Sequence, residues 1–329
     1  MTSAPTVAVI GVGSIAQVHL PAWQDLGARL RLFSAEYSPD VRRTLDPQII
    51  TGSLDEALDG ADIVDVCTPS HTHPDVIRAA AAAGCDIICE KPLALDVSEA
   101  SAVIAECEQA GVRLYPAHVV RFFPEYATMR AHVAAGGVGE VAVQRFARSG
   151  SRPKASWFAD PTLSGGIVMD QMIHDLDLAR WTAGEVRQVF ARSATAGDVV
   201  GAHVVLTHDN GAISYVSGTW APAGSQFRTR FEVAGSDGLV HHDSAQHSPM
   251  VIDGGTDDTG RGLLPPPTFG ESPYTTQLRE FYAAINGGPE PRVTAADGLE
   301  AVRLAEAANL SLRTGSAVQV STITERTAA

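Results

Sequence analysis

Apolar and polar positions follow two different periods along this chain of 329 residues. In the first third, short apolar runs alternate with amphipathic stretches of about a dozen residues, which predicts strands alternating with helices. The predicted strands cover residues 6–10, 30–35, 63–67, 86–89 and 113–116. The predicted helices cover residues 14–26 (interrupted near Pro21), 54–58, 74–83 and 97–110. This order is typical of βαβ units, so residues 1–120 are expected to form a doubly wound Rossmann domain with a parallel sheet.

After residue 120 the apolar positions recur every second residue, which is the period of half-buried strands. Six such runs predict an open, mainly antiparallel sheet, and they cover residues 141–147, 186–194, 202–207, 212–219, 227–234 and 239–242. Turn sequences such as Asp209-Asn210-Gly211 join them. Helices are predicted at 124–135, 169–181, 274–286 and 297–314, and a Gly/Pro-rich loop at 254–267. Residues 121–329 are therefore expected to form a second domain of the α+β class.

Composition narrows the classes of protein. The chain is 45% hydrophobic and 19% charged, which is usual for a globular protein with a substantial core. Its net charge of -14 argues against nucleic acid or an anionic membrane as partner. The start of the chain lacks a charged segment before its first apolar run, so we do not expect a signal peptide. The four cysteines form no C-x-x-C pair, which favours buried free thiols and a cytoplasmic location.

A glycine-rich turn follows the first predicted strand. Gly11, Gly13 and the small Ala16 are spaced as G-x-G-x-x-A, with Ser14 and Ile15 between them. Such a turn brings a pyrophosphate onto backbone N–H groups at a helix N-terminus. Glu36 lies twenty positions beyond Ala16, where a carboxylate accepts hydrogen bonds from an adenosine ribose and repels a 2′-phosphate. We therefore expect NAD, contacted by Glu36 and Tyr37, although Arg42 and Arg43 leave NADP open.

Two further segments follow predicted strands of the same domain, at the edge where open α/β sheets bind ligands. Thr68, Pro69 and Ser70 begin the first, and His71 and His73 follow. We expect Thr68, Pro69, Ser70 and His73 to lie near the nicotinamide ribose, and no metal, because no acid or cysteine completes a ligand set. The second segment is Glu90-Lys91-Pro92. A lysine at this position is costly to bury unless a partner or the chemistry requires it, so Glu90 and Lys91 are predicted cofactor contacts.

A third motif falls in the predicted helix 169–181. Asp170 and His174 are four residues apart, so they share one helix face, and Asp177 lies one turn further along. An imidazole oriented by a carboxylate is suited to general acid–base catalysis near neutral pH. Apolar residues surround the pair, which predicts a largely buried helix rather than a surface ion pair.

Together these segments resemble the Gfo/Idh/MocA oxidoreductases, the family of glucose–fructose oxidoreductase and inositol dehydrogenase. The matching segments are GVGSIAQVH, CTPSHTHPDVIRAAAAAGCDIICEKPLAL, HVVRFFPEY, SGGIVMDQMIHDLDLARW and DGLEAVRLAEAANLSLRTG. The resemblance implies NAD(P)-dependent hydride transfer at a secondary alcohol of a sugar or cyclitol. It also implies a C-terminal domain that binds substrate and forms oligomers. Met172 departs from the family pattern, because many members carry glycine there.

The resemblance implies catalytic roles for Lys91, Asp170 and His174. His174 would take the hydroxyl proton, Lys91 would stabilise the developing alkoxide, and Asp170 would orient His174. This requires the Lys91 amine and the His174 imidazole to serve the same reaction. Candidate substrate contacts outside this set are His118, Arg121, Arg152, Lys154 and Trp157. A structural role stays open for His118 and Arg121, and a solvated loop for Arg152 and Lys154.

Other functions use the same residues. Tightly bound NAD would allow a redox-neutral reaction, in which transient sugar oxidation permits elimination or glycoside cleavage. Reduction of a keto-sugar by NADPH is a second alternative, and a non-catalytic dinucleotide sensor is a third. A sensor would not need the acid–base set. We expect a homodimer or homotetramer formed through the C-terminal sheet, and we expect histidines 241, 242 and 247 to be a polar loop rather than a metal site.

Overall fold

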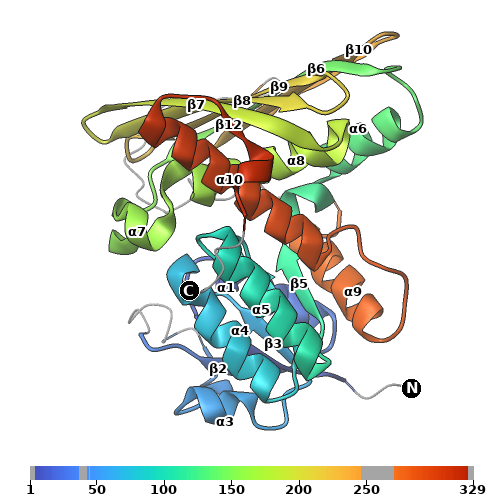
Figure 1. The fold of residues 1–329 in the computed structure, drawn as a ribbon. Coiled ribbons are helices and arrows are strands. Elements are labelled where there is room, and N and C mark those ends of the chain that lie inside the picture. Colours follow the sequence, from blue (N-terminus) through green and yellow to red (C-terminus); the bar gives the residue numbers. More distant parts are fainter. Residues whose placement is uncertain (1–3, 37–42, 44, 246–269, 325–329) are drawn as a thin grey trace. The chain divides into compact units, whose positions relative to one another are not determined.

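The computed structural model describes residues 4–36, 43, 45–245 and 270–324. These divide into two units (Figure 1). Unit 1 contains the described residues up to Phe123 together with those from 270 to Val302, and unit 2 contains those from Pro124 to 245 together with Arg303–Thr324. The sequence places a boundary after residue 120 but does not anticipate that the chain returns to unit 1 after residue 267. The expected loop at 254–267 lies outside the described residues.

The sheet of unit 1 is entirely parallel, as the alternating pattern predicts. Its strands are β1 (Thr6–Ile10), β2 (Arg29–Phe33), β3 (Ile63–Val66), β4 (Asp86–Glu90) and β5 (Leu114–Ala117). Their order is β2-β1-β3-β4-β5, and one further parallel bridge joins Leu32 to Ile50 at the outer edge. Strand β2 lies on one side of β1, whereas β3, β4 and β5 follow on the other side, so the strand order changes direction between β1 and β3. This is the switch point at which open α/β sheets bind ligands beyond the carboxyl ends of their strands.

Helices cover both faces of this sheet. They are α1 (Ala16–Asp25), α3 (Leu54–Leu58), α4 (His73–Ala82), α5 (Val97–Ala110) and α9 (Pro273–Ile285). Right-handed crossovers in opposite directions from the switch point place α1 on one face and the paired helices α4 and α5 on the other. Helix α9, from late in the chain, packs against α1.

Helix α1 corrects one expectation. We expected an interruption near Pro21, yet one helix runs through this residue from Ala16 to Asp25. Proline removes one helical hydrogen bond. The buried side chains around it, among them Leu20, Ala22 and Trp23, hold the helix against the sheet and compensate for the lost bond.

Unit 2 contains a mixed sheet of seven strands. They are β6 (Val141–Ser151), β7 (Val186–Ala196), β8 (Val199–His208), β9 (Ile213–Ala221), β10 (Arg228–Gly235), β11 (Leu239–Asp243) and β12 (Val318–Gln319), in the order β11-β10-β6-β9-β8-β7-β12. All neighbours are antiparallel except β6 and β9, which are parallel. The expectation of an open, mainly antiparallel sheet is confirmed. Strand β12 was not expected, because two residues carry no periodic signal.

Helices α6 (Pro124–Ala134) and α8 (Ile173–Ala183) pack against each other, and α8 lies on β6 and β9 (Figure 1). A short helix, α7 (Pro161–Ser164), precedes a π-helical turn over Val168–Met172. The last helix, α10 (Ala295–Thr314), begins among residues of unit 1 and ends among those of unit 2. None of the helices in the described ranges is long and apolar enough to cross a membrane. All four cysteines are free and buried, as expected.

Candidate functional site

The glycine-rich turn joins β1 to α1 at the carboxyl edge of the unit 1 sheet. Gly11 has a φ of 92°, and a Cβ atom there would lie 2.7 Å from backbone atoms of Cys67 and Thr68. Only glycine satisfies both conditions. At Gly13, by contrast, an added Cβ would meet no atom within 4 Å, and Gly13 and Ser14 are exposed. The turn is therefore closed toward β3 and open on its outer side, which fits a pyrophosphate lying on the backbone.

The residues expected around the adenosine follow β2. Glu36 is exposed, three residues beyond the end of the strand at Phe33, and the Ser34 hydroxyl donates to its carbonyl at 2.6 Å. Its carboxylate is thus placed to reach solvent or a ligand. Arg43 is also exposed. Tyr37 and Arg42 lie outside the described residues, so their cofactor contacts stay predictions.

The segment after β3 lies against the Gly11 turn. Ser70 is buried, whereas Thr68 and Pro69 are partly exposed. The ring of His73 is buried, with Nδ1 2.7 Å from the Pro92 carbonyl oxygen and Nε2 2.8 Å from the Thr68 carbonyl oxygen. Burial lowers the pKa of His73, although both carbonyls favour the charged ring. Both nitrogens therefore contact the protein, and we propose that His73 ties the β3 loop to the loop after β4 instead of binding the cofactor through a ring nitrogen.

Glu90 ends β4, and Lys91 follows it at the same edge. The Lys91–Pro92 peptide bond is cis. Glu90 is 6% exposed, and its Oε2 accepts a hydrogen bond of 3.2 Å from the Lys91 backbone N–H. Lys91 is only partly exposed. The carboxyl ends of β1, β3 and β4 thus bring the open glycine turn, the Thr68 segment and Lys91 to one edge of one sheet.

Asp170 and His174 lie where unit 2 changes its helical geometry. Asp170 falls in the π-helical turn Val168–Met172, and His174 is the second residue of α8. Asp170 is buried and His174 partly exposed. The predicted helix is confirmed, but its first part is wider than an α-helix, so the four-residue spacing does not follow α-helical geometry there. Such π-turns are frequent at functional sites.

Three contacts fix this helix on the unit 2 sheet. The buried Arg148 of β6 donates two hydrogen bonds, of 3.0 and 2.9 Å, to the carboxylate of Asp175. The Gln171 amide donates to the Arg148 carbonyl at 3.2 Å. Met172 is fully buried, and its side chain covers Gly218 of β9. A Cβ atom added at Gly218 would lie 2.4 Å from Cγ of Met172. Asp170 and His174 are therefore carried by a segment whose neighbouring side chains are held in place.

The remaining predicted contacts differ in exposure. His118 and Arg121 are both 1% exposed. Arg121 donates to the Arg292 carbonyl at 2.6 Å and lies 3.2 Å from Asp297, so we propose the structural role for it. In unit 2, Arg152 lies over the Trp220 ring, Trp157 is stacked on Phe158 and Lys154 is exposed. Their substrate contacts stay predictions.

The sequence analysis missed a buried polar cluster in unit 1. His19 and Trp23 of α1 both contact Asp65 of β3, and His19 also faces Glu90. Two signals were present: an acid within the apolar run Ile63–Val66, and a histidine on the buried face of a helix. Arg148 and Asp175 were missed because each looked like an ordinary charged residue of a strand or a helix.

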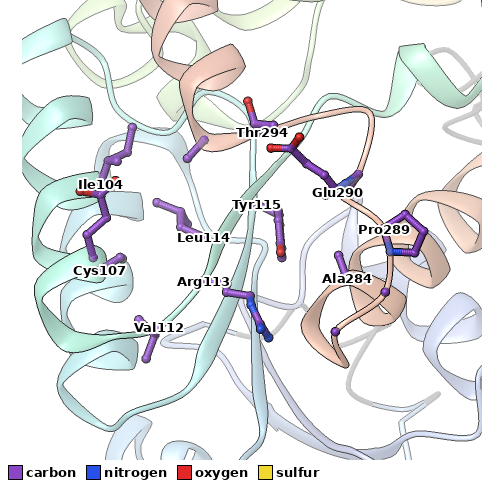
Figure 2. Close-up of a pocket in the computed structure, with 15 residues that line it drawn as sticks. Ile104, Cys107, Val112, Arg113, Leu114, Tyr115, Ala284, Pro289, Glu290 and Thr294 are labelled. Carbon is purple, nitrogen blue, oxygen red and sulfur yellow. The ribbon is translucent and has the colours of Figure 1, made fainter.

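A metal site at histidines 241 and 242 gains no support from the described residues, among which only His19, Asp65 and Cys67 bring three ligand-type atoms close together. His247 lies outside them. The surface hollow in Figure 2, of about 460 Å³, is formed by the end of α5, the start of β5 and residues 284–295. It includes Arg113, Tyr115 and Glu290. It lies at the amino end of β5, away from the loops described above, and we assign it no part in the site.

Two family models match the chain. One, an oxidoreductase family with an NAD-binding Rossmann fold, matches residues 6–118, and the other, a GFO/IDH/MocA C-terminal domain, matches residues 126–241. Myo-inositol 2-dehydrogenase of Thermotoga maritima is 32% identical, over 76% of this chain and 77% of its own. Inositol 2-dehydrogenase of Rhizobium meliloti is 30% identical, over 91% and 94%. Among solved structures, GenD2 from gentamicin A biosynthesis, in complex with NAD, has a TM-score of 0.84 at 28% identity and covers 97% of each chain.

Proposed function

Since the chain belongs to the Gfo/Idh/MocA oxidoreductases, with their NAD-binding Rossmann fold, we propose that it is an NAD-dependent dehydrogenase of a sugar, glycoside or inositol. The observation that carries the proposal is the edge of the unit 1 sheet. There the open Gly13 turn follows β1 and Lys91 follows β4 of the same parallel sheet. Open α/β sheets bind their ligands at this edge, which supports a role for Lys91 in the site.

We assign these residues the following roles. Backbone N–H groups of the Gly11–Ala16 turn bind the pyrophosphate, and Glu36 accepts from the adenosine ribose. Bound NAD supplies the hydride acceptor for a secondary alcohol. His174 takes the hydroxyl proton, while Asp170 orients His174 and binds a neighbouring hydroxyl. The Lys91 ammonium stabilises the negative charge that develops on the alcohol oxygen.

The substrate class is proposed from the relatives, several of which are named as inositol or sugar dehydrogenases. One relative is named for NADP, D-xylose 1-dehydrogenase of Haloferax volcanii, at 30% identity. The exposed carboxylate of Glu36 supports NAD for this chain, because it would repel a 2′-phosphate.

The test is a screen for NAD reduction with inositols, aldoses and glycosides, followed at 340 nm and repeated with NADP. We expect turnover with at least one polyol and a clear preference for NAD. Glu36→Ala should weaken that preference. No turnover with any polyol in either cofactor, by a protein that binds NADH, would contradict the proposal.

Lys91→Ala should lower kcat about a thousandfold or more, because the charge on the alkoxide loses its main counter-charge, and should leave NADH affinity within a few-fold. His174→Ala should do the same. NADH binding is measured by fluorescence titration, and unchanged turnover in Lys91→Ala would remove the residue from the mechanism.

The screen for NAD reduction also separates the alternative functions. In a dehydrogenase, NADH accumulates in step with the oxidised product. In a redox-neutral enzyme, product forms while NADH only cycles, and in a keto-sugar reductase oxidation of added NADPH predominates. A sensor would bind dinucleotide and show none of these.

A further inference from the structure

A buried charge network adjoins the Glu90–Lys91 pair in unit 1. Nδ1 of His19 lies 2.8 Å from Oδ2 of Asp65, and its Nε2 lies 3.2 Å from Oε1 of Glu90. His19 and Asp65 have no exposed surface. Trp23 donates to the same Asp65 oxygen at 2.7 Å. Within the described part of the chain, neither Nε2 of His19 nor Oε1 of Glu90 has a well-aligned hydrogen bond, and the two atoms face each other at 3.2 Å.

The arrangement favours a charged ring. Each ring nitrogen faces a carboxylate, and only the imidazolium carries an N–H at both positions. Burial by itself lowers the pKa of His19, but the charge of Asp65 and its hydrogen bond to the ring leave the pKa well above its ordinary value. The groups around the ring are Trp23 on α1, Asp65 and Cys67 on β3, Glu90 on β4 and the Tyr274 ring on α9.

A bound cation is the rival explanation for this cluster, since ligand atoms of His19, Asp65 and Cys67 lie within 4.8 Å of one another. The Asp65 oxygen, however, already accepts hydrogen bonds from His19 and Trp23. Burial also raises the pKa of the Cys67 thiol to about 12, so the thiol beside the imidazolium is neutral. An imidazolium between two carboxylates accounts for the same contacts without an ion.

We infer that His19 is a positioning residue, whose imidazolium holds the Glu90 carboxylate at the end of β4 and so sets the charge beside the backbone turn that carries Lys91. Oε2 of Glu90 accepts from the Lys91 backbone, which couples the carboxylate to that turn. One positive ring and two carboxylates leave a net charge of minus one at this place. Burial lowers the pKa of His73, and the charge of Lys91 lowers it further. The inference rests on the proposed function only for the catalytic meaning of Lys91.

The sequence makes a direct test possible, because it contains two lysines, Lys91 and Lys154. Reductive methylation with ¹³C-formaldehyde gives each amine its own NMR signal, and a pH titration follows the proton affinity of both. Lys154, in unit 2, is the internal reference. The proteins compared are the parent, His19→Gln, Glu90→Gln and the double variant. His208→Gln is the matched control, because His208 is also a buried histidine, bound to Gly184 and Ser214 of unit 2.

The single variants are expected to act in opposite directions. His19→Gln removes a positive charge and should raise the proton affinity of Lys91 about tenfold. Glu90→Gln removes a negative charge and should lower it by a similar factor. The double variant removes both charges and should return Lys91 to within about threefold of the parent. Lys154 should not respond, and His208→Gln should leave Lys91 unchanged.

Two results would overturn the inference. One is an unchanged Lys91 in His19→Gln, which would mean that Glu90 takes up a proton when the ring is lost. The other is a His19 ring that is neutral at pH 7 in the parent, measured by ¹⁵N NMR of histidine-labelled protein. The ¹⁵N measurement needs no variant, so it decides the matter even if His19→Gln does not fold.

Neither measurement needs substrate or turnover. If Lys91 responds as expected but no polyol reduces NAD, the proposed function fails and the charge network stands. If a polyol is oxidised and the proton affinity of Lys91 is unchanged in His19→Gln, the inference about the charge network is wrong and the proposed function stands. With a substrate in hand, His19→Gln should lower kcat more than it changes KM for NAD, and the double variant should recover part of that loss.

Discussion

Gly218 is the residue of β9 that lies under the Met172 side chain. A Cβ atom there would be 2.4 Å from Cγ and 2.8 Å from Sδ of Met172, both far inside van der Waals contact. Met172 is fully buried between the turn that carries Asp170 and the sheet. The large residue at 172, which departs from the glycine of many family members, is thus matched by a residue without a side chain on the facing strand.

Gly218→Ala should therefore destabilise the protein by about 1–3 kcal/mol, because the overpacked Met172 must move. Met172→Ala alone should cost about 2–5 kcal/mol through the cavity that it leaves. The double variant should be more stable than the sum of the two losses predicts, as measured by urea unfolding. Gly201→Ala on the neighbouring strand β8 is the control, because its nearest neighbour would be 3.9 Å away. Strict additivity would contradict the pairing.

At the scale of elements, the ion pair between Arg148 and Asp175 fastens α8 to β6. Both hydrogen bonds are buried, and Asp175 directly follows His174. A buried pair adds little stability compared with apolar residues of the same size, but it is costly to break. Its main effect is therefore on where the helix lies along the strand, and so on where His174 lies.

Asp175→Asn should cost about 3–5 kcal/mol, because it leaves the Arg148 guanidinium buried without a counter-charge. Replacing both residues with Met and Leu should cost much less in stability while still lowering kcat. The control is Glu232→Gln, which breaks the exposed pair with Arg145 and should cost less than about 1 kcal/mol. Urea unfolding measures all three, and equal losses in the two single variants would refute the argument.

Local patterns predicted most of the elements but not their geometry or their long-range partners. The strand at Thr6–Ile10 and the helix at Val97–Ala110 have the predicted bounds. The apolar pattern marks the strand, and the capping residues Asp96 and Gly111 mark the two ends of the helix. The π-turn at Asp170 was not predicted, since a run of buried residues has the same pattern in a π-turn as in an α-helix. Nor does any local signal pair β6 in parallel with β9, about 70 residues later in the chain.

The candidate site shows the same division. Gly11, Gly13 and Lys91 could be predicted as candidates because their types are unusual directly after a strand. His19 and Asp65 could not, because their meaning depends on each other across 46 positions and a fold must bring them together. His73 was predicted at the cofactor, and both of its ring nitrogens lie close to protein carbonyl oxygens, so its contact with the cofactor stays a prediction.

At the scale of the whole molecule, acid should act on unit 1 through Asp297. Burial alone would raise the pKa of this carboxyl group, but Arg121 and Thr294 outweigh it and lower the pKa to about 2. A carboxylate with a depressed pKa stabilises the fold at pH values above its unfolded pKa of about 4, by about 2 kcal/mol here. This contribution is lost as the pH falls from about 4 through 2. Asp297→Asn should flatten that part of a urea-unfolding profile, and a profile as steep as the parent's would exclude this role.

The unit 2 sheet has a face that bears exposed apolar residues. Strand register places Phe190, Tyr215 and Arg145 in one row across it, and Phe190 and Tyr215 are 36% and 45% exposed. We expect this face to form the homo-oligomer contact. Tyr215→Glu should lower the molar mass measured by light scattering to that of a monomer, whereas Gln24→Glu on α1 should not. A parent that is already a monomer at micromolar concentration would contradict this expectation.

The discontinuity of unit 1 has a consequence for biosynthesis. Helix α9, which covers α1, is translated roughly 150 residues after β5 has left the ribosome. The nascent nucleotide-binding unit therefore has its parallel sheet long before this cover exists, and unit 2 emerges in between. A chaperone that recognises apolar helix surfaces should bind ribosome-stalled chains ending near residue 245 more strongly than chains ending after residue 302.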